Sequence, residues 1–199
     1  MNKPPGRAYL GVGSNIDPDK NVMRALEALS ATAGIKLSAI STFFRTAALS
    51  DPSRTTSVPG QAPRDPDPDF LNGVLEIRTV LTPTELLAVL GRIETNLGRE
   101  RGENRFAPRT IDLDLLLYGR SLYHERDLDW EEVGPGGLMV HADIERRAFV
   151  ALPLFELAPD LILPPHRTPL QALAASFDSP GGRAEHLFTE DMRRQFLSP

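Results

Sequence analysis

The chain has 199 residues, of which 41% are hydrophobic and 25% charged, values that exclude collagen-like, coiled-coil and wholly disordered proteins. It contains no cysteine, which excludes disulfide scaffolds, thiolate zinc sites and cysteine nucleophiles. The formal net charge is −5, so we expect no nucleic-acid partner, and a phosphate ligand would need a local basic cluster.

The sequence also argues against a membrane protein. No apolar run approaches the ~20 residues that a membrane span requires. Residues 1–7 hold two prolines and lack the apolar centre of a signal peptide. We therefore expect a cytoplasmic protein with no membrane partner.

The first part of the chain predicts two strands around one helix. Residues 8–13 are short and apolar, as in a strand, and 13–15 form a turn. Val22, Leu26 and Leu29 then recur at spacings of four and three, which is typical of one apolar helix face. Residues 35–45 are rich in Ile, Leu, Ser, Thr and Phe and predict a second strand.

Residues 51–69 differ in composition from the rest of the chain. They contain five prolines and almost no apolar side chains, so they cannot bury enough surface to offset the loss of chain entropy. We interpret this segment as a long mobile loop. A linker between two domains is the alternative, but the preceding residues would make a very small independent core.

The next elements predict the fold class. Residues 70–80 and 110–118 form strands, and between them Thr82, Pro83 and Glu85 have the pattern of a capped helix start. The resulting order, strand–helix–strand–strand–helix–strand, predicts an α+β, ferredoxin-like βαββαβ sheet with helices packed on one face. We expect further helices at 144–152 and around the apolar residues Phe188, Met192 and Phe196.

Two aspartates lie in the fourth predicted strand. Because side chains alternate along a strand, Asp112 and Asp114 point to one face and the apolar residues at 111, 113, 115 and 117 to the other. The Cα atoms of the two residues lie about 6.6 Å apart. At this distance two negative charges repel each other by ~2–3 kcal/mol at an effective dielectric of about 20. Magnesium would relieve this repulsion, since it binds one or two carboxylates plus phosphate oxygens. A solvated strand face that carries two aspartates by chance is the alternative.

A cluster of arginines precedes these aspartates. Arg99, Arg101, Arg105 and Arg109 fall within eleven residues, interrupted by Gly102 and a proline. Arginine binds phosphate in bidentate fashion, and cations beside metal-binding carboxylates are typical of phosphoryl-transfer sites. A solvated basic loop is the alternative. The segment 11–15 lacks the Gly-Lys-Ser/Thr ending of a P-loop.

Two further polar residues have open interpretations. His141 is either structural or part of a second phosphate-contacting patch with the arginines that follow it. Asn72 lies between apolar residues of a strand, and a buried Asn must be hydrogen-bonded. Its partner is either the backbone or a polar heterocycle.

The segments 70–72, 98–117, 140–141 and 147–149 together resemble 6-hydroxymethyl-7,8-dihydropterin pyrophosphokinase. The most specific part is Pro108-Arg109-Thr110-Ile111-Asp112-Leu113-Asp114, and the resemblance covers roughly residues 7–165. It implies a ferredoxin-like enzyme of folate biosynthesis that transfers pyrophosphate from ATP to the hydroxymethyl group of the pterin and releases AMP. It also implies a domain at 1–165 that includes the loop 51–69, with 166–199 as its C-terminal extension.

The resemblance implies a role for each matching residue. Asp112 and Asp114 would hold two Mg²⁺ ions that bridge the phosphates of ATP, the co-substrate. Arg99 and Arg109 would contact the phosphates and stabilise the transferring group. The other implied nucleotide contacts are Glu94, His141 and Arg147. The implied pterin contacts are Thr46, Leu49, Phe70, Asn72 and Phe149. We expect a monomer whose partners are ATP and the pterin alcohol.

Two other functions stay open from the residues alone. One is a ferredoxin-like nucleic-acid-binding or regulatory module, although the acidic balance and the missing RNP-type aromatic motif argue against it. The other is a different two-metal nucleotidyltransferase, because paired aspartates are common to many such enzymes. Formation of AMP rather than ADP from ATP and the pterin alcohol separates these hypotheses.

Overall fold

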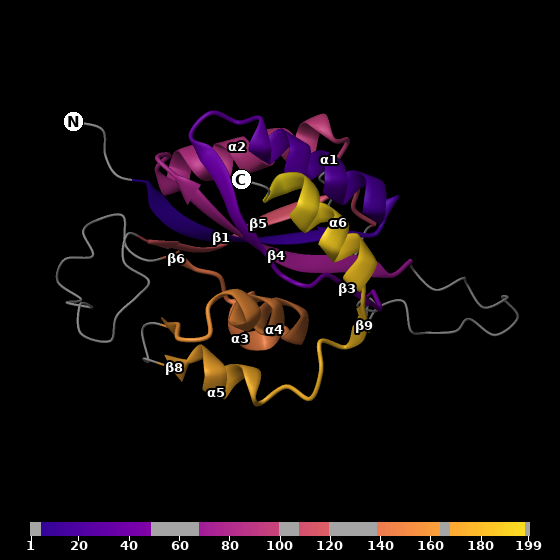
Figure 1. The fold of residues 1–199 in the computed structure, drawn as a ribbon, viewed down its shortest axis with the longest axis vertical. Helices are drawn as coiled ribbons and strands as arrows, with labels where there is room; N and C mark the ends of the chain where they lie inside the picture. The colour runs from indigo at the N-terminus through magenta and orange to yellow at the C-terminus, as the bar shows by residue number, and fades with distance from the viewer. Residues whose placement is uncertain (1–4, 49–67, 100–107, 120–138, 164–167, 198–199) are drawn as a thin grey trace, which may run out of the picture.

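The computed structural model describes residues 5–48, 68–99, 108–119, 139–163 and 168–197. Within these ranges the chain has an α+β fold, in which helices cover an antiparallel sheet (Figure 1). Most of the Pro-rich segment 51–69 lies outside the described residues, so its interpretation as a mobile loop stays a prediction.

Seven of the strands in the described part of the chain form one sheet, and their order is β6-β5-β1-β4-β3-β9, with β2 also paired to β4. All of these pairings are antiparallel. The strands are β1 (Gly6–Ser14), β2 (Ile35–Ile40), β3 (Phe44–Thr46), β4 (Phe70–Thr79), β5 (Asp112–Gly119), β6 (Met139–Val140) and β9 (Gly182–Ala184). A separate pair consists of β7 (Ile162–Leu163) and β8 (Thr168–Pro169).

The helices fall into two groups, one on each face of the sheet (Figure 1). The first group is α1 (Pro18–Ser30), α2 (Pro83–Asn96) and α6 (His186–Phe196). The second group is α3 (Asp143–Arg146), α4 (Ala148–Leu157) and α5 (Leu170–Ala174). In the described ranges no helix combines the length and apolar character needed to cross a membrane.

The predicted elements follow one another in the predicted order, but two of them are divided. The helix predicted at 144–152 is separated at Arg147 into α3 and α4. The predicted strand 35–45 is interrupted at 41–43, which separates β2 from β3. At the interruption the Ser41 hydroxyl accepts a hydrogen bond from Val74 N at 2.8 Å. The Ser41 side chain thus replaces one backbone hydrogen bond to β4. The alternation of residue types in the sequence does not reveal this replacement.

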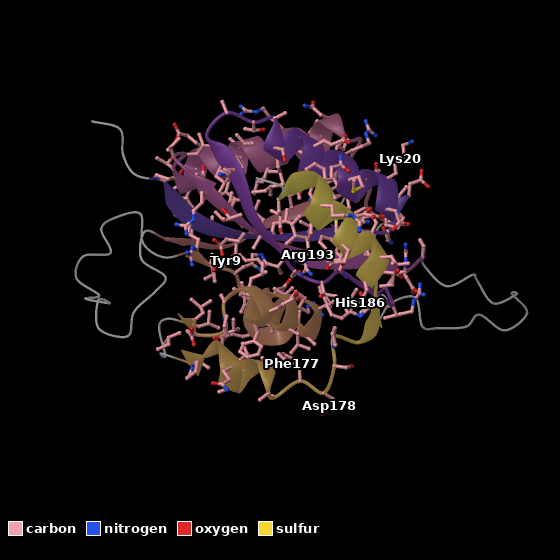
Figure 2. The ribbon with its side chains drawn as sticks, viewed as in Figure 1. Tyr9, Lys20, Phe177, Asp178, His186 and Arg193 are labelled. Atoms are coloured by element: carbon pink, nitrogen blue, oxygen red, sulfur yellow. The ribbon has the colours of Figure 1, made fainter. Side chains whose placement is uncertain are left out.

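The prediction that helices pack on one face of the sheet holds for α1 and α2 but is incomplete, because α4 and α5 cover the other face. One core, with Leu10, Leu26 and Leu90, lies under α1, α2 and α6. A second core, with Tyr9 and Leu154, lies between the sheet and α4 and α5. Figure 2 shows the side chains that fill both layers and labels Tyr9, which belongs to the second. Both faces of the sheet carry buried apolar residues, so both require cover.

The predicted alternation in the fourth strand holds only as far as Leu115. The pairing of β1 with β5 shifts between Tyr9 and Leu10, which is a β-bulge. Leu113 and Leu115 face the first core as predicted, but Leu116 and Leu117 both belong to the second. The predicted orientation of Leu117 is therefore wrong, because the extra residue at the bulge reverses the alternation.

We expect Thr82→Ala to lower the free energy of unfolding by about 1 kcal/mol, because it removes a helix N-cap. The capping box is present as predicted: Glu85 N donates to Thr82 Oγ1, and Thr82 N donates to Glu85 Oε2. Thr84→Ala on the same helix changes an exposed side chain and is the control. Urea denaturation measures both variants. Equal stability of the two would show that the cap contributes nothing.

Candidate active site

A cavity of about 500 Å³ opens on the face of the sheet that α3 and α4 cover. Ten of the twelve residues that the sequence predicts for the site line it. They are Thr46, Phe70, Asn72, Arg99, Arg109, Asp112, Asp114, His141, Arg147 and Phe149. The other two are Glu94, which lies behind the wall, and Leu49, which lies outside the described residues. Five separate segments of the chain therefore meet in one place.

The two aspartates of β5 line this cavity on the same side of their strand, as predicted. Asp112 is 8% exposed, and Asp114 is half-buried. Burial, and next the charge of Asp112, raise the pKa of Asp114 from its ordinary value to about 6, against the opposing influence of His141 and Arg99. The site thus holds one carboxylate whose charge is poorly compensated by its surroundings.

The negative charge of Asp112, in contrast, is compensated by two arginines. Arg99 Nη1 donates to Asp112 Oδ1, and Arg109 Nη1 donates to Asp112 Oδ2. No ion pair of this kind is found for Asp114 among the described residues. Two guanidinium groups therefore share one carboxylate at the cavity wall, beside the second carboxylate.

Glu94 supports this arrangement from behind. Its side chain is 3% exposed, and its Oε1 accepts hydrogen bonds from Leu113 N at 2.8 Å and from Arg99 Nη1. Leu113 is the residue between the two aspartates, so Glu94 joins the end of α2 to the strand that carries them. The implied contact of Glu94 with ATP stays a prediction, because the side chain is not part of the cavity wall.

Asn15 holds Arg109 and Ser14 holds the next residue, Thr110, and neither was a predicted site residue. Asn15 Oδ1 accepts from Arg109 N at 2.6 Å, and Asn15 N donates to Arg109 O at 3.1 Å. Ser14 Oγ donates to Thr110 O at 2.6 Å. The end of β1 therefore fixes the residues that lead into β5. The only signal in the sequence is a Ser-Asn pair after glycine, which alone indicates no more than a turn.

Glycines keep the sheet side of the cavity free of side chains. A Cβ atom on Gly13 would lie 2.8 Å from Asn72 Oδ1, and one on Gly11 would lie 3.3 Å from Leu116 Cδ2. Gly11 and Gly13 belong to the body of β1, where they pair with Asp114 and Asp112. The turn predicted at 13–15 therefore begins later, because Gly13 and Ser14 belong to β1.

Thr46 and Asn72 form a polar pair on the other side of the cavity. Asn72 is 7% exposed, and its Nδ2 donates to Thr46 Oγ1 at 2.8 Å. The partner of Asn72 is thus a side chain rather than the backbone. Phe70 of β4 and Phe149 of α4 line the same cavity. This wall combines apolar rings with hydrogen-bonding groups, as a site for a flat polar heterocycle requires.

His141 and Arg147 line the cavity from just before and just after α3. His141 Nδ1 accepts a hydrogen bond from Asp143 N at 3.2 Å, so the neutral ring carries its proton on Nε2. Arg147 Nε lies 3.7 Å from Asp143 Oδ1. Asp143 thereby orients both of the predicted nucleotide-contacting side chains.

The donor set fits magnesium. Two carboxylates on one strand offer oxygen ligands, and the raised pKa of Asp114 shows that a cation beside it would relieve an unfavourable charge. Within the described ranges, no group of three or more His, Cys, Asp or Glu side chains could hold a metal ion. Magnesium usually keeps several waters and completes its coordination with substrate phosphate oxygens, so two carboxylates suffice.

The chain is similar to known proteins along most of its length. The model of the 7,8-dihydro-6-hydroxymethylpterin-pyrophosphokinase (HPPK) family matches residues 9–159. A 2-amino-4-hydroxy-6-hydroxymethyldihydropteridine pyrophosphokinase from Haemophilus influenzae is 37% identical over 79% of this chain and 84% of the relative. The enzyme of that name from Pseudomonas aeruginosa is 38% identical over 85% of this chain and 91% of the relative. The chain belongs to the HPPK family.

Solved structures support the α+β fold. The chain aligns over 98% of its length with a crystal structure of an HPPK-DHPS in complex with substrates, with a TM-score of 0.57 and 13% identity. A Plasmodium falciparum HPPK-DHPS variant gives a TM-score of 0.57 at 12% identity. The chain covers 45% and 48% of these two proteins, so it spans about half their length.

Family membership establishes the reaction. The chain is an ATP-dependent pyrophosphokinase of folate biosynthesis, as the resemblance in the sequence implied. The cavity with its ten predicted residues is the candidate active site for this reaction.

In buffer with a chelator, we expect Asp114→Asn to raise the Tm by a few degrees at about pH 8 and to change it little near pH 4. The pKa of Asp114 is raised to about 6 in the folded protein. The protonated Asp114 side chain therefore contributes to stability in full below the pKa of the unfolded chain. This contribution is lost as the pH rises through about 6, where the buried side chain becomes charged.

Asp112→Asn is the matched control for this measurement. Asp112 pairs with Arg99 and Arg109, so its neutralisation leaves two guanidinium groups without their carboxylate and should lower the Tm. Thermal denaturation between about pH 4 and pH 8 compares both variants with the wild type. A Tm difference between Asp114→Asn and the wild type that does not change with pH would contradict the conclusion that burial disfavours the charged form of Asp114.

Proposed function

We propose that Asp112 and Asp114 hold two Mg²⁺ ions and that the ten predicted residues that line the cavity divide into a phosphate side and a pterin side. The observation that supports this most is that paired aspartates, arginines and aromatic rings all line one cavity of about 500 Å³. A cavity of that size accommodates a small heterocycle beside a chain of phosphates. Asp112 and Asp114 would hold the magnesium, which would supply positive charge that offsets the charge of the phosphates.

On the phosphate side, the arginines carry the stabilisation of the transferring group. Arg99 and Arg109 already lie within hydrogen-bonding distance of one anionic oxygen pair, that of Asp112. ATP brings phosphate oxygens that compete for the same guanidinium groups, which bind phosphate in bidentate fashion. We infer that each arginine moves from the carboxylate to phosphate and thereby frees Asp112 for the metal. Glu94, His141 and Arg147 complete the nucleotide side.

On the pterin side, Thr46 and Asn72 provide hydrogen bonds, and Phe70 and Phe149 stack on the ring. The support is the position of all four around one cavity and the hydrogen bond between Asn72 and Thr46. Donors and acceptors fixed by a neighbour select a heterocycle better than mobile ones, because less side-chain entropy is lost on binding. We include Leu49 in this wall from the resemblance alone.

In the reaction, the hydroxymethyl oxygen of the pterin attacks the β-phosphorus of ATP. The new O–P bond forms as the bond from the β-phosphorus to the oxygen of AMP breaks, and the hydroxyl proton passes to solvent. No covalent enzyme intermediate is required. Among the described cavity residues we assign no general base, so orientation of the two substrates and charge neutralisation by the arginines supply most of the rate.

We also propose the ferredoxin-like class for the sheet. The order β5-β1-β4-β2 with antiparallel neighbours supports it, since each helix of the βαββαβ order then connects strands that are not adjacent. The family match ends at residue 159, which supports a division into a domain at 1–165 and an extension at 166–199. We also propose that the protein is a cytoplasmic monomer without a nucleic-acid partner; the acidic balance supports the last of these points.

We expect Asp112→Ala and Asp114→Ala each to lower turnover by at least ~10²-fold, because phosphate charge then goes uncompensated. The assay incubates ATP, Mg²⁺ and 6-hydroxymethyl-7,8-dihydropterin and measures AMP by chromatography. Asp178→Ala is the control, since this aspartate is exposed and does not line the cavity. Near-normal turnover in both site variants would overturn the metal assignment.

We expect Arg109→Ala to have opposite effects on metal and on catalysis. Without nucleotide, Mn²⁺ should bind several-fold more tightly, because one competitor for Asp112 is gone. Turnover should fall by ~10²–10³-fold, because a cation that meets the transition-state charge is lost. Electron paramagnetic resonance titration of Mn²⁺ and steady-state kinetics measure the two effects.

Arg147→Ala is the matched control for the metal titration. Arg147 lines the same cavity, but its described ion pair is with Asp143. Its removal should leave the affinity for Mn²⁺ alone unchanged. Weaker Mn²⁺ binding by Arg109→Ala would show that the arginine does not compete with the metal.

A further inference from the structure

The C-terminal segment Gly182–Phe196 contacts the strand that carries Thr46 into the cavity. Its first part, β9, pairs with β3 along the edge of the sheet, with Gly182 opposite Thr46. Its second part, α6, packs against the first core through the fully buried Met192. The family match ends at residue 159, so this whole segment lies beyond it.

Phe43, the last residue of the interruption 41–43 between β2 and β3, depends on this segment for its backbone hydrogen bonds. Phe43 N donates to Thr189 Oγ1 at 3.0 Å, and Phe43 O accepts from Glu185 N at 2.8 Å. Thr189 is 1% exposed, so a lost partner would leave a buried N–H unsatisfied. Both backbone groups of Phe43 are therefore held by the C-terminal segment rather than by the sheet.

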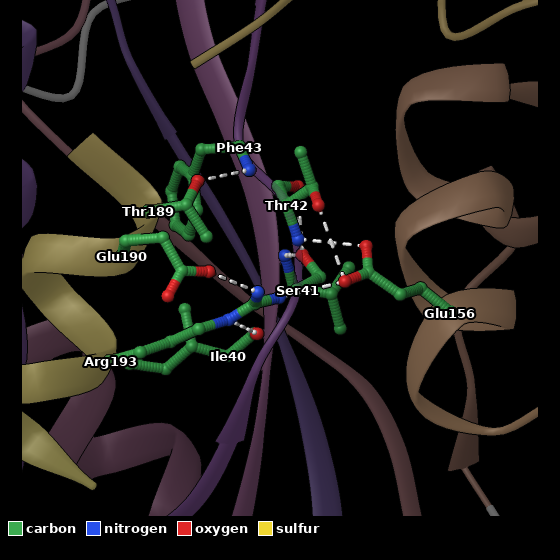
Figure 3. A network of polar contacts seen from close by, with 9 residues as sticks. Ile40, Ser41, Thr42, Phe43, Glu156, Thr189, Glu190 and Arg193 are labelled. Carbon is green, nitrogen blue, oxygen red and sulfur yellow. Dashed lines mark hydrogen bonds and ion pairs between the residues drawn. The ribbon is translucent and has the colours of Figure 1, made fainter. Parts of the chain in front are cut away.

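A second set of contacts joins this interruption to both helical layers (Figure 3). Arg193 Nε donates to Ile40 O at 2.9 Å, and its Nη2 donates to Glu156 Oε1 at 2.7 Å. Glu156, on α4, accepts from Thr42 N at 2.8 Å through its other oxygen. Figure 3 shows the strand between α6 on one side and α4 on the other.

The close approach of β9 to β3 requires glycine. A Cβ atom on Gly182 would lie 2.0 Å from Arg45 O and 2.8 Å from Thr46 Cγ2. Backbone atoms cannot give way as a flexible side chain can, so any side chain at 182 would push β3 or β9 aside. Gly182 is therefore in contact with Thr46 itself, from the side opposite β4.

The phosphate side of the cavity does not share these supports. Asp112 and Asp114 lie on β5, which is held by β1 and by Glu94. Arg109 is held by Asn15. A shift of β3 should thus move Thr46, and with it the partner of Asn72, while the residues assigned to ATP stay in place.

We propose that the segment Gly182–Phe196 braces the pterin side of the active site, with Thr189 and Gly182 as positioning residues. They act through the backbone of β3 on Thr46, and neither touches substrate. The inference rests on the assignment of Thr46 and Asn72 to the pterin.

Thr189→Val tests the brace, because it keeps the side-chain volume and removes the acceptor for Phe43 N. We expect the KM for the pterin to rise about three- to tenfold, with kcat and the KM for ATP changed by less than about twofold. Hydrogen exchange of peptides that cover 42–46 should become faster, while exchange in 75–79, which pairs with β1 and β2 rather than β3, stays the same. Gly182→Ala should have the same effects by displacing β9.

Two controls on α6 separate positioning from stability. Met192→Ala opens a cavity in the core under α6 and should lower the Tm more than Thr189→Val, yet leave the KM for the pterin unchanged. Leu187→Ala changes a side chain that is 86% exposed and should alter neither quantity. An equal rise in the pterin KM for Met192→Ala would show that the segment contributes only stability.

Asn72→Ala distinguishes failure of the brace from failure of the pterin assignment. If Asn72→Ala raises the pterin KM and Thr189→Val does not, the brace is wrong and the assignment stands. If neither variant changes it, the assignment is wrong. In that case the brace is judged by hydrogen exchange, and unchanged protection of 42–46 in Thr189→Val overturns it.

Discussion

The repulsion between Asp112 and Asp114 is the constraint on which the rest of the site depends. One strand places two carboxylates on the same side, and the protein compensates only one of them, through Arg99 and Arg109. The other has its pKa raised to about 6 by burial and by its neighbour. Such an arrangement is costly for an apoprotein and useful for a site that must attract cations together with phosphate.

The two sides of the cavity are held by different parts of the chain. Glu94 and the turn at Ser14 and Asn15 hold the strand and the arginine of the phosphate side. The pterin side depends on β3, a strand of three residues between β4 and β9. A mutation can therefore alter the orientation of the pterin without altering the charges that act on ATP. The contributions of substrate orientation and of charge neutralisation to catalysis are then separable by mutation.

Local patterns in the sequence predicted most of the helices and strands, because alternation, helical spacing and the cap at Thr82 are decided by nearby residues. They also indicated the paired aspartates and the arginines of the candidate site, whereas about half of the predicted site residues came from the resemblance. The patterns failed where contacts between residues distant in the sequence determine the local structure. The bulge opposite Tyr9 reverses Leu117, and the interruption at 41–43 is satisfied by residues more than a hundred positions away. Glu94 was recognised by resemblance, but its bond to Leu113 N depends on how α2 packs against β5.

The most direct test counts the metal ions bound with and without nucleotide. Mn²⁺ is titrated by electron paramagnetic resonance into the wild-type protein, alone and with an ATP analogue whose α,β-bridging oxygen is replaced by a methylene group. We expect weak binding of Mn²⁺ alone, since Asp112 is shared by two arginines, and tight binding of two ions per chain with the analogue. Equal affinity and stoichiometry in both titrations would contradict the assignment of Asp112 and Asp114 as a phosphate-dependent metal site.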